Sequence, residues 1–164
     1  MPDSWDFANN KPERPSLPIM TYGLALVCVA VTAANWASGM DRNSQWFTLG
    51  HLGWLPTELI WNGNYAPLLT SIFLHRSVLH IVFNMIVFLR LGSVIEDTIN
   101  PLHYALFIVS AAIVSSGVEI AAFGEAGAGM SGVVYAMCGL MWAGRSKIAA
   151  WQKGLIRAVA GGRG

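Results

Sequence analysis

The chain has 164 residues, of which 54% are hydrophobic and only 12% are charged, and its mean hydropathy is +0.50. Soluble domains carry about twice that share of charged residues, and the near balance of 10 Lys and Arg against 9 Asp and Glu offers no basic surface for nucleic acid. Because aromatic residues are frequent and charges are few, disorder is excluded as well, and an all-α polytopic membrane protein is indicated.

Four apolar segments in chain order have the length and composition of membrane helices, although polar residues interrupt the second. The start of the third is well marked, because Asn100 can cap a helix and Pro101 suits the first helical position. The predicted spans are about residues 19–37, 67–92, 102–123 and 130–144.

The segments outside the spans set the orientation. Residues 1–18 form a polar start, and residues 38–66 form a long outer loop with three tryptophans, which suit a loop in the membrane interface or a small loop core. Residues 145–164 carry five cations and no acid, so the positive-inside rule places them in the cytoplasm. Four spans then put the N-terminus there too. We expect a multi-pass protein of the bacterial inner membrane, since no mitochondrial presequence precedes the first span.

Polar side chains in the second span are costly in lipid unless they have partners. His80 and Asn84 are four residues apart and share one helical face. They are candidates for a functional site, and polar contacts between helices are the simpler alternative. His75 and Arg76 lie near the outer end, where Arg76 is expected to extend to the interface.

The fourth span opens with a glycine-rich stretch at residues 127–132, which places Ser131 at or near a helix N-terminus. There the backbone N–H groups of Met130 and Ser131 are predicted to be free to bind a developing oxyanion. Tyr135 lies one turn below Ser131. A stripe of small residues lets a neighbouring helix approach closely. The stripe consists of Gly132, Ala136, Gly139 and Ala143.

Residue counts place His80 and Ser131 at similar depths. Arg145 marks the cytoplasmic boundary of the fourth span, and Glu96 marks that of the second. Ser131 lies 14 residues before Arg145, and His80 lies 16 residues before Glu96. At 1.5 Å per residue these intervals are about 21 and 24 Å, in a hydrocarbon layer about 30 Å thick. Both side chains are therefore expected beneath the outer surface, in one pocket that opens outward. A serine, a histidine, an asparagine and free amides at one level suggest acyl-transfer chemistry.

Two blocks of the sequence carry recognisable motifs. The first, at residues 68–96, contains TSIFLH at 70–75 followed by His80 and Asn84, and the second contains GMSGVVYA at 129–136. Together they resemble the second and fourth spans of the rhomboid intramembrane serine proteases.

The resemblance implies a rhomboid-like helical bundle of six membrane helices, of which four are present here. It also implies a serine endopeptidase that cleaves single-span membrane proteins in the lipid bilayer and needs no metal or organic cofactor. Ser131 would be the nucleophile, and His80 and Asn84, with the Ser131 amide, would form the oxyanion site. Tyr135 would pack under the general base. The supporting residues would be Gly129, Met130, Gly132, Tyr135 and His75.

The general base that a serine nucleophile needs is missing. The family carries it as a histidine in a sixth span, whereas the four histidines here all precede Ser131. We expect a C-terminally truncated rhomboid with spans 1–4 only, which is inactive by the usual mechanism. Its fourth span, without a partner for the small-residue stripe, is expected to promote association. The four histidines of the chain are His51, His75, His80 and His103.

Other functions are weighed against this one. A non-catalytic rhomboid-like protein that binds transmembrane-helix clients is the alternative, whereas a transporter or channel subunit would leave the Gly-Met-Ser-Gly opening unexplained. No metal site is expected, because the five-residue spacing puts His75 and His80 on different helical faces. Cys28 and Cys138 lie in apolar runs, which argues against a disulfide framework or a metal knuckle.

Overall fold

The computed structural model describes residues 17–37, 60–124, 127–146, 148 and 151, and the structural statements below concern these residues. All regular elements within these ranges are helical, which confirms the predicted fold class. In chain order they are α1 (Ile19–Ala37), α4 (Pro67–Thr70), the 3₁₀ turn η1 (Ser71–Phe73), α5 (Val78–Glu96), α6 (Pro101–Phe123) and α7 (Ser131–Gly144).

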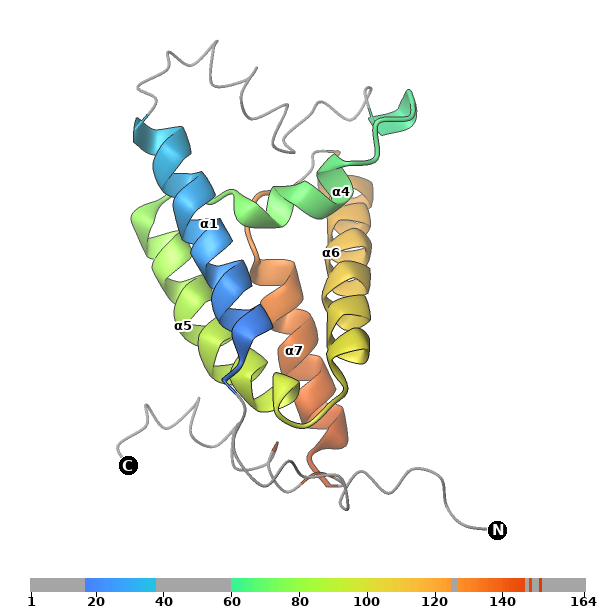
Figure 1. The fold of residues 1–164 in the computed structure, drawn as a ribbon. Coiled ribbons are helices and arrows are strands. Elements are labelled where there is room, and N and C mark those ends of the chain that lie inside the picture. Colours follow the sequence, from blue (N-terminus) through green and yellow to red (C-terminus); the bar gives the residue numbers. More distant parts are fainter. Residues whose placement is uncertain (1–16, 38–59, 125–126, 147, 149–150, 152–164) are drawn as a thin grey trace.

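Four of these helices stand side by side and alternate in direction (Figure 1). Helices α1, α5 and α6 are long and apolar enough to cross a membrane, whereas α7 has only 14 residues. At 1.5 Å per residue, α7 is about 21 Å long and is shorter than a hydrocarbon layer of about 30 Å. It begins below α4, inside the bundle, and runs toward the end at which α1 begins (Figure 1). The start of α7 is therefore set back from the end of the bundle at which α1 ends (Figure 1).

The second span differs from the prediction of residues 67–92. Its apolar run is divided into α4 and η1, then a turn, and then α5, which begins at Val78 and ends at Glu96. The break occurs because the Ser77 backbone is extended and its side chain accepts a hydrogen bond from the His80 backbone N–H at 3.2 Å. A serine in this position satisfies one of the unpaired donors of a helix start. As a result, His75 lies in the turn before α5 and His80 in the first turn of α5.

The ends of α6 follow the sequence closely. The Asn100 side chain accepts a hydrogen bond from the Leu102 backbone N–H at 2.9 Å, and Pro101 is the first helical residue. Gly124 ends the helix with a φ of +74° and donates its N–H to the Ile120 carbonyl at 2.8 Å. The cap predicted from Asn100 and Pro101 is thus confirmed.

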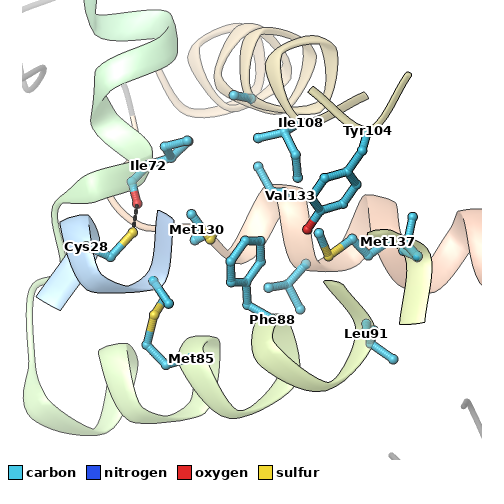
Figure 2. Close-up of a cluster of buried hydrophobic side chains, with 14 of the residues drawn as sticks. Cys28, Ile72, Met85, Phe88, Leu91, Tyr104, Ile108, Met130, Val133 and Met137 are labelled. Carbon is cyan, nitrogen blue, oxygen red and sulfur yellow. Dashed lines mark hydrogen bonds between the residues drawn. The ribbon is translucent and has the colours of Figure 1, made fainter. Parts of the chain in front are cut away.

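The hydrophobic core lies between α1, α5, α6 and α7 (Figure 2). Three residues of α7, Val133, Met137 and Met141, are completely buried in it. Phe88 and Tyr104 reach the same core from α5 and α6 and are also completely buried. The short helix is therefore held on several sides by longer helices.

A polar cluster joins the start of α1 to the end of α5. The Glu96 carboxylate accepts hydrogen bonds from the backbone N–H groups of Met20 and Thr21 at 2.9 and 2.8 Å, and from the Thr21 hydroxyl at 2.6 Å. The Tyr104 hydroxyl lies 2.8 Å from Thr21 Oγ1. A Cβ at Gly92 would come within 2.7 Å of that tyrosine oxygen, so only glycine allows this approach.

Part of the predicted cytoplasmic tail packs back on the bundle. The Trp151 indole N–H donates to Thr98 Oγ1 at 2.6 Å, and the ring covers Gly144. Several expectations fall outside the described residues, namely those on residues 1–16, residues 38–59 with His51, and residues 152–164.

Candidate active site

The approach of Gly129 to α5 brings the two sequence motifs together. Gly129 has a φ of +116°, and its N–H donates to the Ser71 carbonyl at 3.0 Å. A Cβ at this position would lie 2.6 Å from His80 Cε1 and 3.5 Å from Asn84 Nδ2. The segment that leads into α7 therefore lies directly against His80 and Asn84, two residues before Ser131.

Asn84 offers an unused hydrogen-bond donor at this contact. Its side chain is 6% exposed, and its Nδ2 atom has no hydrogen-bond partner in the described part of the chain. A buried amide without a partner costs about 1–3 kcal/mol, so such groups are rare and call for an explanation. A donor kept free in this way is suited to a ligand oxygen.

Ser131 is the first residue of α7 and is partly buried. The cap residue before it, Met130, makes no side-chain cap, and the Ser131 N–H has no acceptor among the residues that the structure describes. The Met130 N–H, in contrast, donates to His75 Nε2 at 3.4 Å. The prediction of two free amides is therefore wrong for Met130, because a histidine from the turn before α5 accepts its hydrogen bond.

His75 lies beside His80 and behind the entry to α7. It is 3% exposed, and its ring meets the His80 ring edge-on with 5.2 Å between the centroids. Its Nδ1 atom lies 3.4 Å from Thr32 Oγ1 of α1. His75, His80, Asn84 and the start of α7 thus form one contiguous site.

Comparison with models of known protein families identifies the family of this chain. The model of the Rhomboid domain matches residues 62–160, which is more than half of the chain and includes both motifs. The chain belongs to the rhomboid family.

Curated relatives agree with this assignment. The chain is 30% identical over 123 residues to the Rhomboid protease GlpG of Salmonella typhi and to that of Salmonella paratyphi A. The match covers 75% of this chain and 42% of each relative, so the rhomboid chain spans less than half the length of these relatives. With its apolar helices, the family identifies an integral membrane protein with a helical bundle.

One group of polar residues beside this candidate site was missed in the sequence. Ser71 and Ser116 place their hydroxyl oxygens 3.3 Å apart, and Ser115 and Glu119 of α6 lie against Gly132 and Gly127. The rule that singled out His80 and Asn84, that polar residues within a span are functional candidates, applies equally to these α6 residues. The site thus has polar groups from both α5 and α6.

Two predicted features of α7 can be located in the structure. Tyr135 is 76% exposed, and its place under the general base stays a prediction. The small-residue stripe is divided, because Gly132 is covered by Ser115 of α6 whereas Gly139 faces open space. Only the lower part of that stripe remains available to a partner.

Proposed function

We propose that this chain supplies the nucleophile and the oxyanion site of an intramembrane serine endopeptidase. Ser131 Oγ attacks the scissile carbonyl, and the Ser131 N–H, Asn84 Nδ2 and the His80 ring stabilise the resulting oxyanion. The observation that carries the proposal is the approach of Gly129 to His80 and Asn84, next to an unpartnered Asn84 amide. Removal of a single oxyanion donor typically lowers kcat about 10²–10³-fold.

The proposed reaction also needs a base to take the Ser131 proton. No histidine follows Ser131 in the sequence, and the Nε2 atom of His75 already accepts the Met130 N–H. We therefore place the base outside these 164 residues and propose that they do not cleave alone.

The proposed substrates are single-span membrane proteins that enter from the lipid. The carbonyl of a peptide bond within a helix is occupied by the backbone hydrogen-bond ladder, so the segment must unwind before attack. The start of α7, set below the outer end of the bundle, is suited to a bond near the outer surface (Figure 1).

The test begins with the coding DNA beyond Gly164, read in all three frames for apolar segments that contain a histidine. The longest polypeptide it encodes is placed in liposomes with a fluorogenic single-span substrate and a fluorophosphonate probe. We expect cleavage and labelling at Ser131, no labelling of Ser131→Ala, and about 10²–10³-fold slower cleavage by Asn84→Ala. The 164-residue chain alone should leave the substrate intact.

Ser110→Ala is the matched control, because Ser110 is an exposed serine of α6 and its loss should change neither readout. Equal labelling of wild type and Ser131→Ala would refute the nucleophile assignment. The alternative, a protein that holds transmembrane clients, is favoured instead if a single-span protein co-purifies uncut and does so equally with Ser131→Ala.

We also propose that the end of the described bundle at which α1 begins and α7 ends faces the cytoplasm of a bacterial inner membrane. Support comes from the five cations and no acids after residue 144. A reporter protein that is active only in the cytoplasm, inserted into the full chain at residue 17 or at residue 146, should be active at both positions. A reporter that is inactive at either position would contradict this orientation.

A further inference from the structure

His75 has a role that neither the nucleophile nor the oxyanion donors account for. It is almost completely buried between α1, the turn before α5 and the entry to α7. We propose that His75 is a positioning residue that is held in one neutral tautomer and fixes the Met130 peptide. The consequence for catalysis rests on the proposed function.

The hydrogen bonds on either side of the ring require the same tautomer. Nε2 accepts the Met130 N–H at 3.4 Å and must therefore carry no proton. On the other side, the Thr32 hydroxyl donates to the Phe73 carbonyl at 3.2 Å, which leaves the Thr32 oxygen to accept from His75 Nδ1 at 3.4 Å. A neutral imidazole with its proton on Nδ1 satisfies both contacts.

The Met130 peptide is fixed from two further directions. Its side chain is completely buried in the core beside Phe88 (Figure 2). The preceding Gly129 N–H is bound by the Ser71 carbonyl at 3.0 Å. With both neighbouring attachments made, the His75 bond determines the orientation of the Gly129–Met130 peptide unit, which lies directly before the unit that carries the Ser131 N–H.

Two consequences follow for the site. Of the Met130 and Ser131 amides, only the Ser131 N–H has no acceptor in the described structure, so one of these two backbone donors and not both serves an oxyanion. His75 itself is excluded as the base for Ser131, because its unprotonated nitrogen is occupied. Its role is to connect α1, through Thr32, to the geometry of the nucleophile.

The direct test uses the 164-residue chain in bicelles, with ¹⁵N-labelled histidine and backbone. We expect His75 to show the Nδ1-protonated tautomer, and the Met130 amide to exchange about tenfold more slowly than the Ser131 amide. Thr32→Val, which removes one acceptor for Nδ1–H and leaves the Phe73 carbonyl beside the ring, should narrow that difference. Ser93→Ala, which removes a hydroxyl bonded only within its own helix, should preserve it. An Nε2-protonated His75, or equal exchange of the two amides in wild type, would overturn the proposal.

A second test compares two variants that each keep half of the ring's polar positions. In His75→Gln the side-chain oxygen can reach the Nε2 position and accept the Met130 N–H, whereas in His75→Asn it reaches only the Nδ1 position. Slow Met130 exchange should survive in the first variant and disappear in the second. Identical exchange in both would contradict the role of Nε2.

The same pair, made in the longest encoded polypeptide, separates this inference from the proposed function. His75→Gln should retain cleavage, and His75→Asn should lower kcat at least about tenfold while KM changes little, because the defect lies in the transition state. If no form cleaves any substrate, the proposed function fails, and the exchange and tautomer measurements still decide the role of His75.

Discussion

Position 129 accepts no side chain for two separate reasons. The φ of +116° is one that L-residues rarely adopt, and a Cβ would come within 2.6 Å of His80. Gly129→Ala is therefore expected to lose about 1–3 kcal/mol of unfolding free energy and to displace His80. Equilibrium unfolding in mixed micelles and fluorophosphonate labelling of the longest encoded polypeptide measure the two effects.

Gly139→Ala is the control for that substitution. Gly139 lies in α7, the helix that follows Gly129, with open space around it and no unusual φ, so alanine should be neutral or stabilise α7 by up to about 1 kcal/mol. If the two variants behaved alike, the close approach at position 129 would have no functional meaning.

Replacing Asn84 is expected to change stability and activity in opposite directions. Its buried Nδ2 atom lacks a partner in the described structure, which costs about 1–3 kcal/mol. Asn84→Leu, with a side chain of similar volume, should therefore unfold at a higher free energy and cleave about 10²–10³-fold more slowly. The same two assays apply, and a variant that is less stable yet fully active would contradict an oxyanion role.

At this scale the sequence predicted which residues meet but not which hydrogen bonds they make. Equal depth along two helices was enough to expect the Ser131 segment near His80, and the contact through Gly129 agrees with that expectation. The free Met130 amide was a wrong prediction, because its acceptor is 55 residues away in a turn whose position no local pattern defines.

Among the elements, α1 depends on α5 for its first turn. The Glu96 carboxylate accepts three hydrogen bonds from Met20 and Thr21 at the N-terminus of α1. Glu96→Gln keeps the size but removes the charge and one acceptor, so we expect a loss of about 1.5–3 kcal/mol of unfolding free energy. Unfolding in mixed micelles measures it.

Asp97→Asn tests whether that loss is specific to Glu96. Asp97 is the adjacent residue, is exposed, and accepts none of the three hydrogen bonds from Met20 and Thr21, so its change should cost clearly less unfolding free energy than that of Glu96. Similar losses in both variants would mean that acidic charge at this end of the bundle matters more than the contacts with α1.

The elements differ in how far sequence could define them. Asn100 and Pro101 carry their own start signal, and α6 begins where they indicate. The start of α5 was misplaced because residues 67–74 continue the apolar composition of the span, and Ser77 is recognisable as a cap only from its extended backbone. Glu96 was interpreted as a boundary residue since its partners lie in another helix.

For the whole molecule, the outward face of α7 predicts self-association. Tyr135 and Trp142 are 76% and 63% exposed, and Gly139 between them has open space. Small residues on a membrane helix allow close contact with another helix, so the 164-residue chain should form concentration-dependent oligomers in detergent. Cross-linking and sedimentation measure this.

Gly139→Leu should weaken that association by at least about tenfold, because a bulky side chain prevents close approach. Gly23→Leu is the matched control on α1, where glycine also has open space. A strictly monomeric and heat-resistant preparation would exclude association through α7.

The link between Glu96 and the first turn of α1 also bears on how the protein is made. The Glu96 carboxylate and its partners Met20 and Thr21 are separated in the sequence by 76 and 75 positions, respectively. At about 5–20 residues per second, a ribosome needs roughly 4–15 s to pass from one to the other. During that interval the first amides of α1 lack the acceptor that they have in the finished bundle, so the first turn of α1 is expected to become stable only after residue 96 has been made.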